Sequence, residues 1–211
     1  MKRVLTTLFL LSSLVIAAQP NYNFSTMKRE KLGRGIVAVR ESSKDVFVSW
    51  RYLSSDPMNI GFNVYRDGIK LTKEPIVKGT FFRDSDSNSE KKNYTVKPVI
   101  QGKESEELSG SYTLPANAPV GYINIPLDKP ADGVTPDGQK YTYSPNDASV
   151  GDVDGDGQYE IILKWDPSNA HDNAHNGYTG NVYFDCYRLN GEKLWRIDLG
   201  KNIRAGAHYT Q

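Results

Sequence analysis

Residues 152–165 read DVDGDGQYEIILKW, a short acidic loop containing two glycines that is followed directly by an apolar run. The run from Ile161 to Trp165 is short and apolar, which predicts a buried strand. A second polar cluster, Asp166–Asn173, comes next, and residues 181–189 and 193–199 then predict a hairpin. A unit of acidic loop, strand, polar loop and hairpin is typical of one β-propeller blade, a small sheet of about four strands.

The acidic loop also predicts a metal site. Asp152, Asp154, Asp156 and Glu160 stand at relative positions 1, 3, 5 and 9, and alternate side chains of a tightly curled loop can converge on one point. Carboxylates brought together repel one another, which implies a cation, and calcium accepts about six to eight oxygen ligands in a loose geometry. We therefore expect Ca²⁺ bound by these four carboxylates, with the backbone carbonyl of Gln158 as a fifth ligand.

The loop has two other possible interpretations, an EF-hand and an acidic surface turn. An EF-hand is excluded, because that loop needs a bidentate Glu at its twelfth position, which is Leu163 here. An acidic surface turn that holds no ion remains the alternative.

The segment after the strand contains two histidines and a turn signal. His171 and His175 are spaced i, i+4, which on a helix would be typical of a metal site, but the surrounding Pro, Asn and Gly residues argue against a helix. We expect solvated loop histidines.

Asn190-Gly191 predicts a type I′ hairpin turn. Arg204 and His208 lie where a following blade would begin, and we expect a structural role for both, with a place in the lining of the cleft as the alternative.

Residues 24–116 predict a β-sandwich that resembles a fibronectin III module. Short alternating runs are separated by turn residues about every 8–12 positions. Trp50 shares a strand face with Val46 and Val48, so we expect it in the core. Asp67-Gly68 is a strong hairpin signal. This region shows no cluster of chemistry-bearing residues and is expected to be structural, with carbohydrate contact as a weaker option.

Residues 117–144 predict an ordered connector. Prolines and Asp-Gly pairs punctuate it and disfavour a helix or a central strand. Tyr122, Ile123 and Ile125 are too apolar for a free linker, so we expect the connector to pack on the domain that follows, residues 145–211.

Residues 1–18 predict a secretory signal peptide. Lys2 and Arg3 precede an apolar run that ends at Ala17-Ala18, a small-residue cleavage site. We expect cleavage and a secreted or periplasmic chain with no membrane contact afterwards; an uncleaved membrane anchor is the alternative. Cys186 would then be a single thiol, and its aromatic neighbours indicate a small buried packing residue.

Composition excludes several classes of protein. The 211 residues contain 26 Lys and Arg against 25 Asp and Glu, a formal net charge of +1, so nucleic acid is not an expected partner. The single Cys excludes an intrachain disulfide and a multi-cysteine metal site. The aromatic fraction of 11% is too high for a disordered chain.

Several joined motifs resemble family 11 polysaccharide lyases, which are rhamnogalacturonan lyases. They are GDVDGDGQYEIILKWDPSN at 151–169, GYTGN at 177–181, LWRIDLG at 194–200 and RAGAH at 204–208. LGRG at 32–35 and FNVYR at 62–66 resemble the same family, so the likeness covers nearly all of the mature chain.

The resemblance implies an all-β protein with a fibronectin III-like sandwich followed by a propeller, which has eight blades and several calcium ions in the full-length family. It implies β-elimination at the rhamnose–galacturonate bond of the pectic polysaccharide rhamnogalacturonan I. Asn146 and Asp166 are spaced like the family's sugar-contacting Asn and Asp and would bind substrate; loop capping or calcium ligation is their alternative role. We assign no catalytic residue within this chain.

Length qualifies this expectation. Residues 145–211 amount to roughly one and a half blades at about 40–45 residues each. We therefore expect an N-terminal fragment holding the first one to two blades, monomeric and inactive alone, whose parent carries the lyase activity. The alternative from another class is a non-enzymatic, calcium-dependent glycan-binding or adhesion module.

Overall fold

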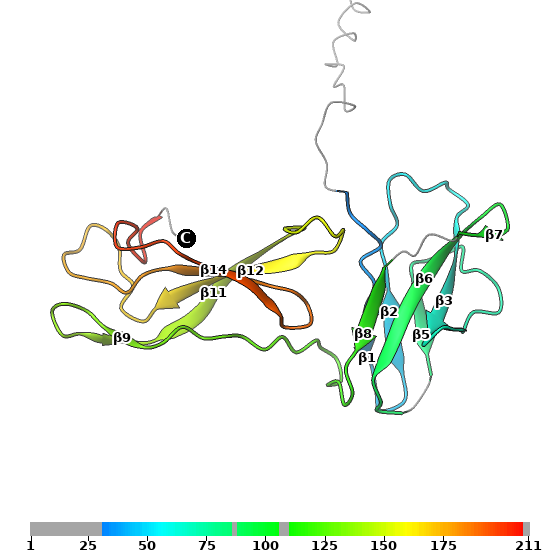
Figure 1. The fold of residues 1–211 in the computed structure, drawn as a ribbon, viewed down its shortest axis with the longest axis horizontal. Coiled ribbons are helices and arrows are strands. Elements are labelled where there is room, and N and C mark those ends of the chain that lie inside the picture. Colours follow the sequence, from blue (N-terminus) through cyan, green and yellow to red (C-terminus); the bar gives the residue numbers. More distant parts are fainter. Residues whose placement is uncertain (1–30, 86–87, 106–109, 209–211) are drawn as a thin grey trace, which may run out of the picture.

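The structure is a computed structural model that describes residues 31–85, 88–105 and 110–208. The expected signal peptide, residues 1–18, lies outside the described residues. The regular elements are antiparallel β-strands, arranged in two bodies joined by an extended segment (Figure 1). The all-β class predicted from the sequence is therefore confirmed. Among the described residues, no helix has the length and apolarity needed to span a membrane.

The N-terminal body consists of two sheets. Their strands are β1 (Val37–Arg40), β2 (Val46–Ser49), β3 (Gly61–Arg66), β4 (Ile69–Lys70), β5 (Phe81–Asp84), β6 (Lys92–Ile100), β7 (Lys103–Glu104) and β8 (Ser111–Leu114). One sheet has the order β1-β2-β5; the other has the order β4-β3-β6-β7, and β8 also pairs with β6. Strands of both sheets contribute to a single hydrophobic core.

The alternation of side chains explains this core. Val46 and Val48 of β2 are fully buried, and Trp50, directly after the strand, is 5% exposed. The Trp50 ring meets the Phe62 ring edge-on, with centroids 5.4 Å apart. The predicted core position of Trp50 is confirmed. Asp67-Gly68 joins β3 to β4 with both residues at positive φ, 50° and 81°, as a type I′ turn requires.

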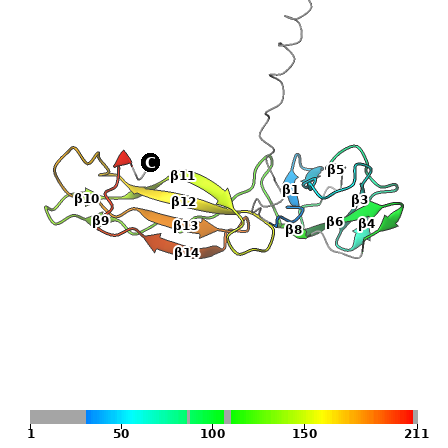
Figure 2. The same ribbon diagram turned by 90° about the horizontal axis from the view of Figure 1, so that it is seen from above.

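The second body is a four-stranded sheet in the order β11-β12-β13-β14, in which each strand pairs with the next along the chain (Figure 2). Its strands are β11 (Tyr143–Gly151), β12 (Glu160–Pro167), β13 (Tyr183–Tyr187) and β14 (Lys193–Asp198). Its smaller core contains Tyr143, Leu163, Trp165 and Tyr187. Cys186 is also buried, as predicted, and burial raises the pKa of its thiol.

Two details of this sheet differ from expectation. β11 was not predicted, because Pro145 and the polar residues around it show no alternation; the strand is tolerated as an edge strand with a register shift between Pro145 and Ala148. The predicted type I′ turn at Asn190-Gly191 is wrong, since only Gly191 has positive φ, 88°. The pairing shifts register next to this loop, which makes the loop longer than two residues.

Residues 117–144, which were predicted as a connector, are held at both ends. Gly121 donates its N–H to the carbonyl of Arg40 at 2.7 Å on the N-terminal body. Further on, Ile125 packs against the core of the four-stranded sheet, and the Asp128 N–H donates to the Tyr187 hydroxyl at 3.0 Å. Tyr122, expected to pack as well, is 61% exposed. The connector also forms the short pair β9 (Gly133–Val134) and β10 (Lys140–Tyr141).

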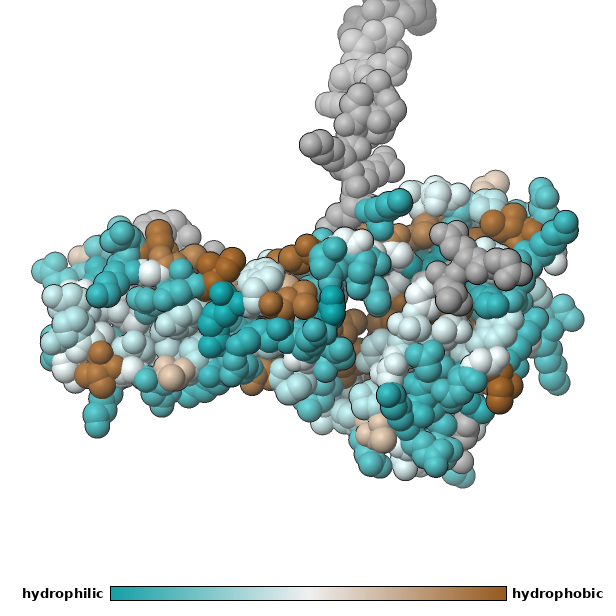
Figure 3. Space-filling view, viewed as in Figure 1, coloured by the Kyte–Doolittle hydropathy of each residue, from teal (hydrophilic) through white to brown (hydrophobic). Residues whose placement is uncertain are grey.

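The surface is mostly polar on the face drawn in Figure 3, where apolar atoms form small separate groups. Scattered exposed apolar side chains are normal for a folded protein and identify no site by themselves. Polar and charged side chains therefore define the candidate site.

Candidate functional site

The acidic loop between β11 and β12 turns its carboxylates inward by local hydrogen bonds. The Asp152 carboxylate accepts the N–H groups of Gly155 at 2.8 Å and Gly157 at 3.1 Å. Asp154 accepts the N–H of Asp156 at 3.1 Å. Gly155 and Gly157 have φ of 78° and 88°, a left-handed conformation that glycine adopts without steric cost. The loop can therefore curl tightly enough for alternate side chains to meet.

Asp152, Asp154 and Asp156 each offer a carboxylate oxygen, and these oxygens all lie within 4.8 Å of one another. The carboxylate spacing seen in the sequence thus brings three of the four predicted acidic ligands together. Hard cations such as calcium take carboxylate and carbonyl oxygens at about 2.3–2.6 Å, so one ion could contact all three residues. The donor set present in the chain fits such a cation.

The other two predicted ligands lie differently. Glu160 is 1% exposed, and its Oε2 accepts the Val153 N–H at 2.9 Å, so its carboxylate closes the base of the loop. Gln158 is half-buried and donates its N–H to Asp156 at 2.8 Å. Their role as ligands stays a prediction.

Sequence reasoning missed a positively charged side chain beside this loop, that of Arg188. Arg188, directly after β13, pairs with Asp154 and, at 2.9 Å, with Glu192. The hydrogen bond from Arg188 lowers the pKa of the Asp154 carboxyl, which keeps that carboxylate ionised. No local pattern identifies Arg188, because it reaches the loop only through the pairing of β12 with β13.

The same loop is held from outside by the N-terminal body. The Gly157 carbonyl accepts the N–H of Gly33 at 2.6 Å and a guanidinium N–H of Arg51 at 3.2 Å. The Arg51 guanidinium also lies over the Tyr159 ring, 4.4 Å from its centroid. Gly33 belongs to the LGRG motif that supported the family resemblance, but its partner could not be foreseen from sequence.

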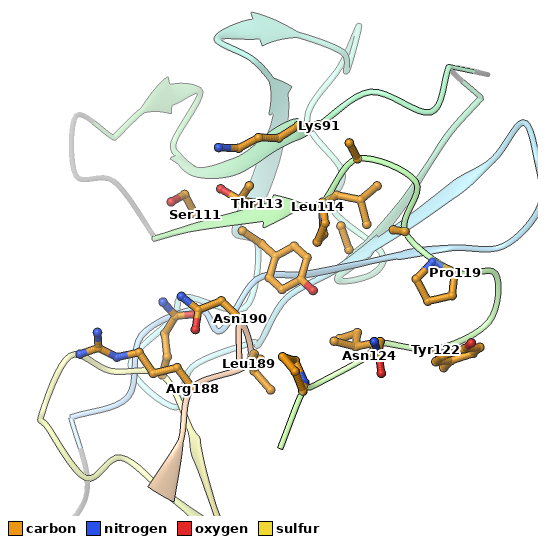
Figure 4. Close-up of a pocket in the computed structure, with 18 of the residues that line it drawn as sticks. Lys91, Ser111, Thr113, Leu114, Pro119, Tyr122, Asn124, Arg188, Leu189 and Asn190 are labelled. Carbon is orange, nitrogen blue, oxygen red and sulfur yellow. The ribbon is translucent and has the colours of Figure 1, made fainter. Parts of the chain in front are cut away.

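A cleft of about 890 Å³ opens beside the loop, between the two bodies. In Figure 4, Lys91, Ser111 and Thr113 lie on one side of it, and Arg188 and Asn190 lie on the other. Asp156, Gln158, Tyr159 and Glu160 also line it. Charges of both signs face this space, so its lining favours no single ligand charge.

The two predicted sugar-contacting residues are neighbours in the structure. Asn146 of β11 donates from Nδ2 to Asp166 Oδ2 of β12 at 2.7 Å, next to the register shift that follows Pro145. Lys164 is 4% exposed and lies 3.3 Å from the other Asp166 oxygen. Sequence reasoning missed Lys164, although a lysine inside an otherwise apolar strand was a signal. The three side chains form a polar cluster with both hydrogen-bond donors and an acceptor.

A buried carboxylate supports this part of the sheet from inside. Asp185 of β13 is fully buried and accepts hydrogen bonds from Trp165 Nε1 at 2.8 Å, the Tyr187 hydroxyl at 2.6 Å and Arg196 at 2.7 Å to each oxygen. Burial alone would raise the pKa of Asp185, but the hydrogen bonds from Arg196, Tyr187 and Trp165 outweigh it and the net pKa is lowered. Asp185 therefore links β12, β13 and β14.

The histidine segment forms no helix, as expected, but one histidine is not solvated. His171 is half-buried, with Nδ1 2.9 Å from the Asn169 carbonyl and Nε2 2.9 Å from the Arg204 guanidinium. Arg204 also donates to the His175 carbonyl at 2.6 Å, so it pins this loop. His175 is exposed, and His208 is 83% exposed with Nε2 3.4 Å from Asp172.

Two family models match this chain. The family model "Rhamnogalacturonan I lyases beta-sheet domain" matches residues 27–113, and "Rhamnogalacturonan lyase family 11, C-terminal domain" matches residues 122–211. The first match covers the N-terminal body, and the second covers most of the connector and the four-stranded sheet. The class is therefore that of the rhamnogalacturonan lyases.

Individual relatives agree. The chain is 51% identical to rhamnogalacturonan endolyase YesW of Bacillus subtilis over all of its own length and 33% of the relative. It is 52% identical to rhamnogalacturonan exolyase YesX of the same organism over 86% of this chain and 29% of the relative. The crystal structure of YesW superposes with a TM-score of 0.74 at 53% identity, covering 86% of this chain and 30% of the other. The chain belongs to the family 11 rhamnogalacturonan lyases and spans about a third of the length of the curated relatives it matches.

Proposed function

We propose that this chain is part of a calcium-dependent rhamnogalacturonan lyase that cleaves the bond between rhamnose and galacturonate in the pectin backbone by β-elimination. The observation that carries the proposal is the Asn146–Asp166 pair, 2.7 Å apart beside the buried Lys164, in a chain 51% identical to an endolyase along its whole length. The relatives' own names supply the substrate.

The reaction needs a base, a proton donor and positive charge from the protein. A base removes the proton at C5, the electron pair forms the C4–C5 double bond, and the C4–O bond breaks as that oxygen leaves and takes up a proton. The C5 proton is weakly acidic, so positive charge near the uronate carboxylate is required to stabilise the developing enolate-like charge. No water is consumed.

In this proposal Asn146 and Asp166 orient the sugar. The Asn146 amide and the Asp166 carboxylate can exchange hydrogen bonds with sugar hydroxyls, and Lys164 fixes the Asp166 carboxylate from the side. The residues that remove and deliver protons are assigned to parts of the lyase outside this chain, because the chain spans only a third of its relatives.

Asp152, Asp154 and Asp156 would hold a calcium ion, together with Glu160 and the Gln158 carbonyl. Bound there, the ion supplies positive charge that offsets the repulsion of the clustered carboxylates. This loop adjoins the N-terminal body, whereas Asn146 lies within β11, before the register shift and away from the loop. We therefore give this ion a structural role and not a role at the reacting carbon.

The domain organisation of this chain fits a longer protein that contains a propeller. We propose that residues 24–116 form a fibronectin III-like sandwich, residues 117–144 a connector, and residues 145–211 the beginning of a propeller whose first blade is β11 to β14. Nearly all of β11 is exposed in this chain. In a propeller the first strand of each blade lines the central channel, which suits a strand that carries Asn146. We also propose that the signal peptide, residues 1–18, directs export, and that the protein is monomeric.

The test is a lyase assay on rhamnogalacturonan with the full-length protein, followed through the ultraviolet absorbance of the new double bond. We expect activity that calcium supports and a chelator removes, and no activity from the 211-residue chain alone. Asp166→Ala should lower kcat/KM by at least about 10²-fold, the order that loss of substrate positioning costs.

Asp198→Ala is a matched control. Asp198 forms a similar pair with Asn181, at 2.9 and 3.0 Å, in β14 at the other edge of the same sheet. Its substitution should leave kcat/KM close to wild type. A full-length protein that binds the polysaccharide with calcium but forms no unsaturated product would overturn the lyase proposal and favour a glycan-binding module.

A further inference from the structure

We infer that Arg51 and Gly33 of the N-terminal body are positioning residues for the cation loop, so that docking of the two bodies sets the affinity of the loop for a divalent cation. This inference rests on the cation site proposed above and adds residues from a different part of the chain. Arg51 stands 106 residues before its contact in the loop.

The connection runs through one residue, Gly157, by its N–H and its carbonyl. Gly157 donates its N–H to Asp152 Oδ2 at 3.1 Å, which orients a carboxylate of the acidic cluster. Its carbonyl accepts the Gly33 N–H at 2.6 Å and an Arg51 N–H at 3.2 Å. The same residue is therefore bound on one side by a candidate ligand and on the other side by the N-terminal body.

Steric constraints show that this contact is close. A Cβ added to Gly157 would lie 2.6 Å from the Gly33 nitrogen, and a Cβ added to Gly33 would lie 3.3 Å from the Gly157 carbonyl oxygen. A side chain at Gly157 would force the two bodies apart or shift the loop, and a side chain at Gly33 would press on the Gly157 carbonyl. The two backbones meet directly.

Arg51 strengthens the contact in two further ways. The same terminal nitrogen that reaches Gly157 also lies 3.2 Å from the Gly33 carbonyl, so one guanidinium bridges both glycines. Its planar group covers the Tyr159 ring at 4.4 Å, a cation–π contact within the acidic loop. Arg51 thus fixes the loop at Gly157 and at Tyr159.

A site whose ligands are oriented before binding loses less conformational entropy when the ion arrives. Residues that orient metal ligands without touching the metal typically change affinity by about 10–100-fold when mutated. Coupling of this kind is reciprocal, so the cation should also tighten the contact between the bodies.

The experiment is calorimetric titration of the 211-residue chain with calcium chloride. Arg51→Ala should weaken binding by about ten-fold or more, and Arg51→Lys should recover only part of the loss, because lysine keeps the charge but lacks the planar fork. Arg83→Ala is the matched control: Arg83 lies in the same body, pairs with Glu41 and covers Phe47 at 5.5 Å, away from the loop. Its substitution should leave calcium affinity unchanged.

Gly33→Ala tests the contact from the other side if Arg51→Ala fails to fold. It adds one methyl group at 3.3 Å from the Gly157 oxygen and should also weaken calcium binding. Hydrogen exchange supplies a readout unrelated to activity, since calcium should slow exchange of the Gly33 amide, which donates to Gly157.

The possible outcomes distinguish failure of this inference from failure of the proposed function. Equal calcium affinity in wild type, Arg51→Ala and Gly33→Ala overturns the inference but not the cation site. Absence of calcium binding in the wild-type chain overturns the inference and the cation site. A full-length protein that lacks lyase activity, but in which Arg51→Ala still weakens calcium binding, contradicts only the proposed reaction.

Discussion

The N-terminal body and the four-stranded sheet are both antiparallel, yet their interiors differ. In the N-terminal body two sheets share a continuous apolar core that includes Trp50, Phe62 and Tyr94. The hydrophobic cluster of the four-stranded sheet is smaller, with Tyr143, Leu163, Trp165 and Tyr187, and the sheet depends also on the buried carboxylate Asp185. Two sheets can cover each other's apolar faces, whereas one sheet cannot, so polar bonds and neighbouring segments must contribute more of its stability.

The largest effect is expected from the apolar body. Trp50→Ala removes a 5%-exposed ring that packs edge-on against Phe62, and truncation of a buried aromatic costs about 3–5 kcal/mol. Urea unfolding should show this loss, and hydrogen exchange should localise it to β3 and β6. Met58→Ala, at a fully exposed position, is the control and should change stability by less than about 0.5 kcal/mol. An equally small effect of Trp50→Ala would contradict the core position.

The next effect tests the polar interior of the sheet. Asp185→Ala leaves Trp165, Tyr187 and Arg196 without their shared acceptor, and removal of one partner from a buried ion pair costs about 3 kcal/mol. Exchange should increase in β12 to β14, while β3 and β6 keep their protection. Uniform loss of protection in both bodies would mean that they unfold together and that the comparison does not hold.

Acid should weaken the same network. The folded-state pKa of Asp185 is lowered, so its contribution to stability is fully present above the unfolded-state value near 4 and is lost as the pH falls through the folded-state pKa. Asp185→Asn should therefore cost about 1–2 kcal/mol at neutral pH and much less at low pH. Unfolding by urea between pH 7 and pH 3 measures the difference. A constant difference across this range would show that Asp185 does not titrate as described.

The smallest effect concerns the connector. Tyr187→Phe removes a hydroxyl that donates to Asp185 at 2.6 Å and accepts the Asp128 N–H at 3.0 Å, so a loss of about 1 kcal/mol is expected. Exchange of the Asp128 amide should become faster. Tyr178→Phe, at an exposed position, is the matched control and should change neither quantity.

Sequence periodicity was sufficient where the interior is apolar. The alternation around Trp50 and the Asp67-Gly68 signal predicted both the buried face and the turn, since each depends only on neighbouring residues. β11 was not predicted, because its residues are mostly exposed and Pro145 interrupts it. Its pairing depends on β12 and not on its own pattern.

In the candidate site, too, local features could be predicted from the sequence and long-range contacts could not. The spacing of Asp152, Asp154 and Asp156 sufficed to predict that their carboxylates meet, because the loop is local and its glycines permit the curl. The contacts of Arg188 and Arg51 with this loop could not be predicted, since they depend on strand pairing and on a contact between distant segments. His171 was misjudged for the same reason, because Arg204 reaches it from 33 residues away.

The order of strand pairing has a consequence for folding during synthesis. All strands of the N-terminal body precede Pro115, and β11 to β14 each pair with the strand just made. Local pairings close small loops and form quickly, whereas contacts between distant residues form slowly. The N-terminal body can therefore fold on the ribosome before the acidic loop emerges, and it then offers a folded surface for Gly157 to contact.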